Sequence, residues 1–310
     1  MIIHHGIDQL PTIKNAVVTS GTFDGVHLGH RKILQRLQQI AKQSEGESVV
    51  ITFWPHPRLV LYPNDGDHLQ LLNTFEEKAD LLAKSGIDHL IRIPFTKEFS
   101  QKSSQEFIQQ ILIDKLNTKK LVIGYDHKFG RNREGSFEYL RDNADKYGFE
   151  VEEIPRQDIE HVGISSTLIR NTMSEGKIEI SNQYLSHPYT ITGEVVTGDK
   201  IGRTIGFPTA NVKISNPHKL VPSNGVYAIK AIIEEQRCFG MLNIGYRPTV
   251  AGSSKSIEAH LFDFDQDIYG ENITIEFVKR VRDEVKFTDM NALKKQLTKD
   301  RMLVIDILND

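Results

Sequence analysis

The pattern of strands and helices changes once along the chain, and this change constrains the fold more than any other feature. From Ala16 to about Ile154, short β-branched runs alternate with segments that carry apolar residues at helical spacing. This alternation indicates βαβ units, so we predict a doubly wound α/β domain with a parallel sheet covered on both faces. The predicted strands are 16–19, 48–54, 89–94, 119–125 and 149–154, and the predicted helices include 75–83, 107–116 and 137–147.

After about residue 189, strand-like runs follow one another with Gly, Pro and Asn turns and no helix between them. This rhythm is typical of an antiparallel β-barrel, which closes a sheet and removes its exposed edges. The predicted strands are 189–196, 210–214, 225–234, 238–244, 257–264 and 273–280. A C-terminal helix packed over the barrel is predicted from the spacing of Met290, Leu293, Leu297, Val304, Ile307 and Leu308. We expect two domains, 1–182 and 183–310.

Length, charge and cysteine content agree with this division and exclude several classes of protein. The 310 residues exceed the roughly 250–300 that one hydrophobic core usually supports. The formal charge is −3 and the chain has no basic block, so nucleic acid is not an expected partner. A single cysteine, Cys238, and the lack of a signal peptide or a long apolar run favour a cytoplasmic protein without membrane segments. We expect a monomer or a weak homo-oligomer.

The segment 17–30 runs from the first predicted strand into a helix, where open α/β sheets bind ligands. Glycines at three positions allow backbone to pass close to a ligand. His27 and His30 are three residues apart, on one side of the first helical turn and near its unpaired N–H groups. We therefore predict a triphosphate site. Its candidate residues are Gly21, Phe23, Asp24, His27, Gly29 and His30.

Two other interpretations of this segment are weaker. Zinc-binding histidines of metalloproteases are four residues apart with a glutamate between them, and the chain has no such triad. A Walker A loop would end in Gly-Lys-Ser or Gly-Lys-Thr, which is absent. A single histidine near a helix start is usually a cap or a surface residue, but the pair with its glycines after the first strand disfavours that interpretation.

A second element, 163–170, follows the last strand of the first domain. Its serines are good helix caps, the N–H groups behind them could hold phosphate, and an arginine one turn later adds charge. The candidate residues are Ser165, Ser166, Thr167 and Arg170. Together with the segment 17–30, this element resembles the nucleotidyltransferase superfamily. The resemblance implies displacement at the α-phosphorus of ATP, with His27, His30 and Arg170 stabilising the departing pyrophosphate and magnesium assisting.

Further segments narrow the resemblance to one family. His56-Pro57 and the segments 95–99 and 123–135 resemble, in order and spacing, the adenylyltransferase module of bacterial bifunctional riboflavin kinase/FAD synthetase. The match spans nearly the whole chain. It implies that Asp126 contacts the nucleotide, while His127 stands where the family usually has an aromatic residue. Without the resemblance, both residues could simply end a strand.

The start of the second domain, 193–211, is dense in glycine and resembles the glycine loop of the riboflavin kinase family and its Pro-Thr-Ala-Asn signature. Backbone N–H groups of such a loop can fold over phosphates, although a hairpin with surface charges would also explain the glycines. The phosphate candidates are Gly198, Lys200, Gly202 and Gly206. Thr209 and Asn211 alternate along a strand, so both oxygens face one side and can ligate magnesium.

Two further residues receive roles from the same resemblance. Glu258 is implied to be the base for the ribityl 5′-hydroxyl, and its place in an apolar-rich strand agrees, because partial burial makes a carboxylate a stronger base. Arg282 matches a position that helps to hold flavin. As alternatives, Glu258 could be an outward strand residue and Arg282 an ordinary surface arginine. Ser186 replaces a common glycine between the domains.

The resemblance implies an enzyme with two activities. The C-terminal barrel would phosphorylate riboflavin with ATP to give FMN, and the N-terminal domain would join FMN to AMP from a second ATP, giving FAD and pyrophosphate. One rival is an adenylyl- or cytidylyltransferase for another phosphate ester, with the barrel as a specificity module. A second rival is a flavin- or nucleotide-binding regulator without activity. The Pro-Thr-Ala-Asn strand disfavours the first rival, and the competent residues at the motif positions disfavour the second.

Overall fold

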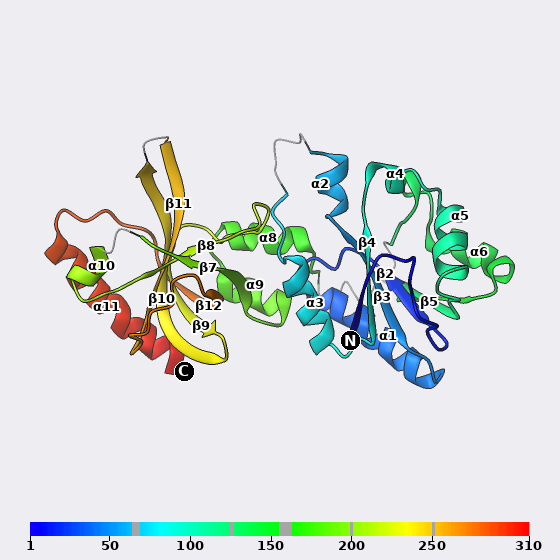
Figure 1. Cartoon of the computed structure of the whole chain (residues 1–310), viewed down its shortest axis with the longest axis horizontal. Coiled ribbons are helices and arrows are strands. Elements are labelled where there is room, and N and C mark those ends of the chain that lie inside the picture. The colour runs from blue at the N-terminus through cyan, green and yellow to red at the C-terminus, as the bar shows by residue number, and fades with distance from the viewer. Residues whose placement is uncertain (64–68, 125–126, 155–162, 199–200, 250–251, 310) are drawn as a thin grey trace. The chain divides into compact units, whose positions relative to one another are not determined.

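The computed structural model describes residues 1–63, 69–124, 127–154, 163–198, 201–249 and 252–309 (Figure 1). Contacts group the chain into two compact units, Met1–Ser166 and Thr167–Asp310. The division predicted after residue 182 falls within helix α9 (Ile178–Leu185), whose contacts are with strands of the second unit. Each unit is described separately.

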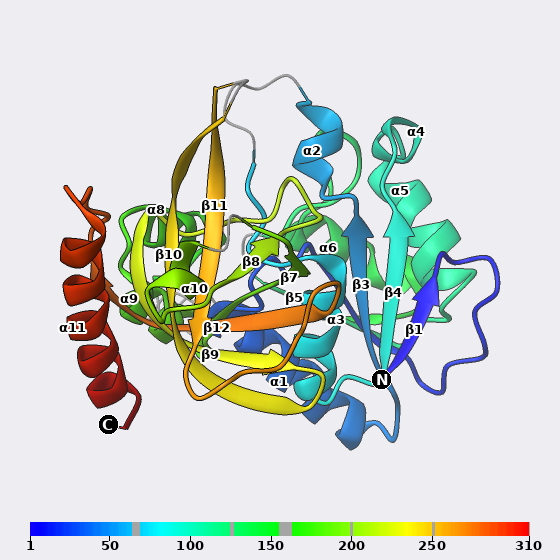
Figure 2. The same ribbon diagram turned by 60° about the vertical axis from the view of Figure 1, so that its left-hand side comes forward.

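The first unit contains a six-stranded sheet with the order β1-β4-β3-β2-β5-β6, in which all neighbouring strands are parallel. Figure 2 shows β3, β4 and β1 side by side and pointing the same way. The strands are β1 (Ile2–His5), β2 (Val17–Ser20), β3 (Ser48–Trp54), β4 (His89–Pro94), β5 (Lys120–Gly124) and β6 (Glu150–Ile154). The strand order reverses beside β2, which is where ligands bind in such sheets. The predicted α/β class is confirmed.

Alternating residues of the strands pack on opposite faces of this sheet. In β3, Val49 and Ile51 belong to one buried cluster and Val50 to the other. Helices α1 (Leu28–Gln43) and α3 (Phe75–Lys84) cover the face of Val50. The other face is covered by α5 (Ser104–Phe107), the π-helix η1 (Ile108–Ile113) and α6 (Phe137–Tyr147). The remaining short helices are α2 (Pro57–Leu61), α4 (Lys97–Ser100) and the 3₁₀ helix η2 (Arg131–Arg133).

Two elements of the first unit differ from the sequence prediction. Strand β1 was not predicted, because this four-residue edge strand is mostly exposed and has no apolar alternation. The helix predicted over 107–116 is instead α5 followed by η1. Backbone bonds from Asp114 N to Gln109 O and from Leu116 N to Ile111 O span five residues, which is the π-helical pattern.

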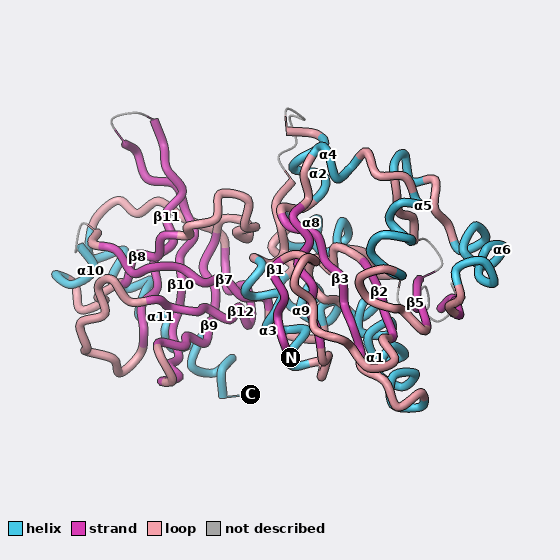
Figure 3. The backbone as a smooth tube through the Cα atoms, turned by 45° about the vertical axis from the view of Figure 1, so that its right-hand side comes forward, coloured by secondary structure: helices cyan, strands magenta, loops and turns pink. Residues whose placement is uncertain are grey.

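The second unit is a closed antiparallel barrel with the strand order β10-β11-β8-β7-β12-β9, as predicted. Figure 3 shows its crossing strands and the β10–β11 hairpin that extends beyond them. The strands are β7 (Tyr189–Val196), β8 (Ala210–Lys213), β9 (Gly225–Ile233), β10 (Gln236–Thr249), β11 (Gly252–Leu261) and β12 (Asn272–Arg282). The other elements are α8 (Ser166–Ser174), which begins at the border of the units, α9, α10 (Ile201–Thr204) and α11 (Met290–Asn309).

Helix α11 closes one side of the barrel. Val304 is fully buried in a cluster with Phe207, Met241 and Phe262, and Leu297 packs against the same cluster. The predicted packing of this helix is confirmed, except that Met290 at its start is exposed. Within the described ranges, no helix has the length and apolar character needed to cross a membrane.

Candidate active sites

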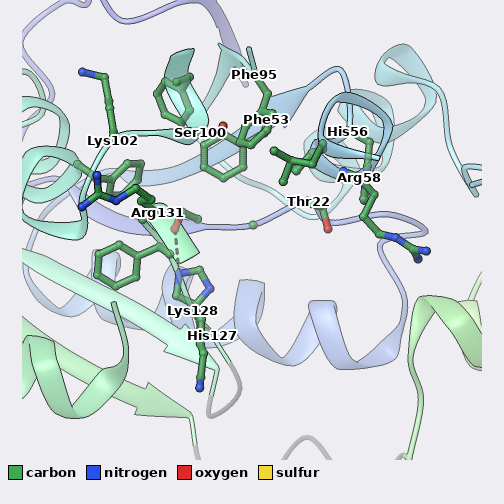
Figure 4. A pocket seen from close by; sticks show the side chains of 18 of the residues that line it. Thr22, Phe53, His56, Arg58, Phe95, Ser100, Lys102, His127, Lys128 and Arg131 are labelled. Atoms are coloured by element: carbon green, nitrogen blue, oxygen red, sulfur yellow. Dashed lines mark hydrogen bonds between the residues drawn. The ribbon is translucent and has the colours of Figure 1, made fainter. Parts of the chain in front are cut away.

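A cavity of about 850 Å³ opens at the carboxyl ends of strands β2, β3 and β5, where the strand order reverses (Figure 4). Thr19 and Ser20 of β2, Phe53 of β3 and Gly124 of β5 contribute to its wall. Parallel strands end on the same edge of a sheet, so the loops that follow them meet here. The N-terminal site predicted from the sequence therefore coincides with a cavity.

The loop between β2 and α1, residues 21–27, forms a tight turn that we call the phosphate turn. Phe23, Gly25 and Val26 all have positive φ angles, of 47°, 89° and 40°. A positive φ is unusual for a β-branched residue such as Val26, and such strain persists only where the surroundings impose it. The N–H of Gly21 donates to the carbonyl of Ile51 at 3.0 Å. Gly21 and Phe23 line the cavity.

The two histidines of the phosphate turn stack on each other, with ring centroids 3.7 Å apart. His27 is the N-cap of α1, and its Nδ1 accepts the backbone N–H of His30 at 3.4 Å. His30 lines the cavity, whereas His27 is buried and is not among the lining residues. Gly29, between them, is buried in the first turn of α1. The sequence spacing thus brings both rings together at a helix N-terminus, and one of them faces the cavity.

The environment of His30 favours the neutral ring. Its pKa lies well below the usual 6.5 because burial removes solvent from the charged form, and interactions with the adjacent His27 ring and the Lys78 ammonium add to this effect. Its Nδ1 is buried and has no hydrogen-bond partner among the described residues. A bound anion would supply a negative charge beside this ring.

Asp24 was predicted to contact the nucleotide, but its side chain lies away from the cavity. Its carboxylate is buried and accepts the backbone N–H groups of Leu72 and Asn73 at 3.0 to 3.2 Å. It is not among the residues that line the cavity. In addition, the Ser166 hydroxyl donates to the backbone carbonyl of Asp24 at 2.9 Å. Asp24 and Ser166 therefore join the phosphate turn to two segments that are distant in sequence.

The remaining predicted residues of the second element lie around the start of α8. Ser165 directly precedes the helix, and Thr167 is exposed in its first turn. Arg170 lies on the same helix, within the second compact unit, and is partly exposed. Asp126 lies outside the described residues.

Aromatic side chains form a wall of the N-terminal cavity that sequence reasoning did not identify residue by residue. Phe53 lies 5.9 Å from Phe95, and Phe107 lies 5.6 Å from Phe129, centroid to centroid. His127 stacks near Phe129 at 5.9 Å, and its Nε2 lies 3.2 Å from the Ser20 hydroxyl. The only sequence signal for this wall was the resemblance of the segments 95–99 and 123–135.

Basic side chains border the same wall. Figure 4 shows Arg58 on one side of Phe53 and Phe95, with Lys102 and Arg131 on the other side. Aromatic faces suit a flat ring system, and guanidinium and ammonium groups suit phosphate. The arrangement can hold a flat, anionic ligand next to the phosphate turn.

A second cavity, of about 480 Å³, lies in the barrel unit. Gly202, Thr209, Glu258 and Arg282 all line it, so four predicted residues from distant parts of the sequence meet there. Asn211 pairs with Glu258 across β8 and β11. Residues paired in this way point to the same side of a sheet, so the amide and the carboxylate are neighbours.

The glycine loop approaches this site closely. A Cβ atom on Gly198 would stand 2.2 Å from the Asn211 amide nitrogen, and one on Gly202 would stand 2.1 Å from the Phe207 carbonyl oxygen. Gly206 has a φ of 85°, which favours glycine. Lys200 lies outside the described residues. Packing and backbone geometry thus account for these three glycines.

Arg282 is held by a buried carboxylate that sequence reasoning missed. Its guanidinium makes three hydrogen bonds of 2.7 to 3.1 Å to Asp300 of α11, whose side chain is 3% exposed. Gln296 donates to the same carboxylate at 2.8 Å. The ion pair fixes the Arg282 side chain at the cavity and distinguishes it from an ordinary surface arginine.

His260 fixes the segment just before β8, which carries Thr209. Its Nδ1 lies 2.7 Å from the carbonyl of Pro208, and because a carbonyl only accepts, Nδ1 carries the proton. Burial lowers the pKa of this ring, and the bond to Pro208 opposes that shift in part. The ring also lines the cavity, beside Phe207 at 5.1 Å.

Comparisons with known proteins agree with this arrangement. A family model described as FAD synthetase matches residues 10–168, and one described as riboflavin kinase matches residues 185–308. A crystal structure described as a macrolide-efflux protein from Streptococcus pneumoniae is similar, with a TM-score of 0.89 and 31% identity over 98% of this chain and 99% of that one.

Curated relatives cover nearly the whole chain. A bifunctional riboflavin kinase/FMN adenylyltransferase from Listeria monocytogenes is 40% identical, covering 96% of this chain and 94% of its own. One from Bacillus subtilis is 40% identical, with 97% and 95% covered, and one from Escherichia coli is 37% identical, with 96% and 94% covered. Fold, paired cavities and full-length similarity together show that the chain belongs to the family of bifunctional riboflavin kinase/FMN adenylyltransferases.

Proposed function

We propose that the chain makes FMN from riboflavin and ATP in the barrel cavity, and FAD from FMN and ATP in the cavity of the parallel sheet. The observation that carries this proposal is the presence of two separate cavities, each lined by the residues of a different phosphate-binding motif. Each matched family segment contains one of the two cavities. That residues 1–182 and residues 183–310 each carry one of the two activities remains a prediction.

In the barrel, we assign Glu258 as the base that takes the proton of the ribityl hydroxyl. It lines the cavity together with Thr209 and Arg282. Arg282, held by Asp300, would bind flavin in a wall that also includes Phe287. The glycine loop, with Gly198, Lys200, Gly202 and Gly206, would contact the phosphates of ATP.

A magnesium ion fits the donor set beside this base. Thr209 supplies a hydroxyl oxygen, Asn211 an amide oxygen, and Glu258 lies next to Asn211 in the strand register. Hard oxygen donors are those that magnesium prefers. When bound, the ion would neutralise charge on the phosphates. Glu258, Thr209 and Asn211 would then orient the hydroxyl group and the nucleotide.

In the parallel-sheet cavity, we assign the triphosphate to the phosphate turn and the flavin to the aromatic wall. His30 faces the cavity, and His27 stacks behind it at the N-terminus of α1. Both would stabilise pyrophosphate as it leaves, with Arg170. Ser165, Ser166 and Thr167 at the start of α8, together with Gly21, Phe23, Gly29 and Asp126, complete the nucleotide site by resemblance. For Asp24, we propose an indirect role through the turn.

Separate substitutions test the assignment. Glu258→Gln should stop the formation of FMN from riboflavin while FMN is still converted to FAD, and His30→Ala should do the reverse. Chromatography of flavins after incubation with magnesium and ATP measures both. Loss of both activities from either single change would refute independent sites. Wild-type chain that forms neither FMN nor FAD would refute the function itself.

The location and partners are proposed from composition and charge. The single cysteine supports a reducing, cytoplasmic compartment, and the charge of −3 supports small-molecule partners rather than nucleic acid. A monomer or a weak homo-oligomer remains the expectation.

A further inference from the structure

A buried lysine lies directly behind the phosphate turn. Lys78 of α3 is 1% exposed and does not line the cavity. Its Nζ donates to the Thr52 hydroxyl at 3.4 Å and lies 5.4 Å from the centroid of the Trp54 ring. An ammonium group is costly to bury without a charged partner, so a buried lysine at this position requires one.

The charged partner of Lys78 is Asp24. Burial lowers the pKa of Lys78 to about 8, and the Asp24 carboxylate opposes this shift. A pKa near 8 leaves Lys78 mainly protonated at neutral pH. Asp24 also accepts the backbone N–H groups of Leu72 and Asn73, just before α3. Its carboxylate, which belongs to the turn, therefore interacts with both this segment and the lysine.

A second contact leads from Lys78 to the turn. The Thr52 hydroxyl, which accepts from Lys78, donates to the backbone carbonyl of Thr22 at 3.3 Å. Lys78 therefore reaches the turn by a hydrogen-bonded chain at Thr22 and by charge at Asp24, on either side of Phe23. Between Phe23 and His27 the backbone takes the positive φ angles described above, and such a conformation requires external support.

The ammonium also acts on the histidine that faces the cavity. Burial is the main cause that lowers the pKa of His30, and the charge of Lys78 contributes in the same direction. A positive charge behind the turn favours an anion in front of it, and burial limits its screening by solvent.

We propose that Lys78 is a positioning residue for adenylyl transfer. It supports the phosphate turn through Thr52 and Asp24 and supplies a fixed positive field behind His30 where the triphosphate binds. This inference rests on the proposed function of the N-terminal cavity. It predicts that Lys78 affects the use of ATP in FAD formation and has no effect on riboflavin phosphorylation.

Three variants of the full-length chain test the proposal. Lys78→Met removes the charge at similar length, Lys78→Arg keeps it, and Lys84→Met is a control on the exposed side of the same helix. Lys78→Met should lower kcat/KM for ATP in FAD formation by about 10- to 100-fold, because small displacements of binding groups have effects of that size. Lys78→Arg should recover part of the loss. Riboflavin phosphorylation should stay unchanged in all three.

Two readouts separate positioning from a general loss of folded protein. KM for ATP should rise in Lys78→Met while KM for FMN stays the same, whereas partial unfolding would lower only the apparent kcat. The pKa of His30, followed by nuclear magnetic resonance, should rise in Lys78→Met and stay near its wild-type value in Lys78→Arg. Equal kinetics of Lys78→Met and Lys84→Met, or an unchanged pKa of His30, would overturn the proposal.

If Lys78→Met does not fold, Thr52→Val decides the question, since it removes the hydrogen-bonded chain and keeps the ammonium. It should raise KM for ATP in FAD formation several-fold, and an unchanged KM for ATP would overturn the proposal. Failure of the proposed function is distinguishable, because the wild-type chain would then form no FAD from FMN and ATP.

Discussion

Replacing Asp300 by alanine should destabilise the barrel unit by about 3 kcal/mol. The change removes three hydrogen bonds to Arg282 and one to Gln296 from a carboxylate that is almost fully buried. Breaking a buried ion pair costs about 3–5 kcal/mol. The Arg282 side chain is 20% exposed and can regain some water, so the lower end of that range applies. For a unit of this size, the melting temperature should fall by about 10 °C.

The single tryptophan makes this prediction easy to check. Trp54 lies in the first unit, so its emission follows that unit alone, while circular dichroism follows both. Asp300→Ala should lower the melting temperature of the barrel unit, followed by circular dichroism, and leave the transition followed by Trp54 emission unchanged. KM for riboflavin should rise because Arg282 loses its anchor. In Arg282→Ala/Asp300→Ala, the loss should be smaller than the sum of the single changes. Additive losses, or an equal shift in the emission of Trp54, would refute the reasoning.

Three further predictions concern single positions in the two units. Gly202→Ala should lower FMN formation about tenfold by displacing the loop from Phe207, with FAD formation from FMN unchanged in the same chromatographic assay. Leu37→Ala, fully buried on α1, should cost the first unit about 2–5 kcal/mol in urea unfolding followed by Trp54 emission, and a smaller change would contradict its place in the core. Because the pKa of His30 is lowered in the folded state, the unfolded state binds more protons below about pH 6.5. The first unit should therefore lose stability from about pH 7 to about pH 5, and the loss should be smaller in His30→Gln; equal losses would count against the buried neutral ring.

Local sequence patterns predicted most of the fold. The strands 48–54 and 89–94 and the helix 137–147 were predicted with the bounds that the structure has, because each is a continuous apolar or periodic run. The edge strand β1 lacked such a pattern. The π-helix η1 was missed because its backbone bonds differ from those of an α-helix by only one residue.

The sites were predictable where a motif is contiguous, and less so where the contacts join distant segments. The histidine pair follows directly from its spacing on α1. By contrast, Asp24 meets the backbone of Leu72, 48 residues away, and nothing in the local sequence specifies that contact. The Asp300 partner of Arg282 and the aromatic wall depend in the same way on tertiary packing, which periodicity does not encode.

The closed barrel and the open sheet differ in the strand edges that they offer for pairing with other chains. In the closed part of the barrel every strand has a neighbour on both sides, whereas the β10–β11 hairpin, after Ile244 and before Glu258, pairs among the described residues only with itself and keeps open edges. The sheet of the first unit instead ends at β1 and β6, each with one neighbour in the described structure. At β1, the exposed Ile2 and Ile3 lie on that border. Because the exposed side chains at this edge are apolar, we expect strand-to-strand aggregation at β1, and polar substitutions at Ile2 or Ile3 should suppress it.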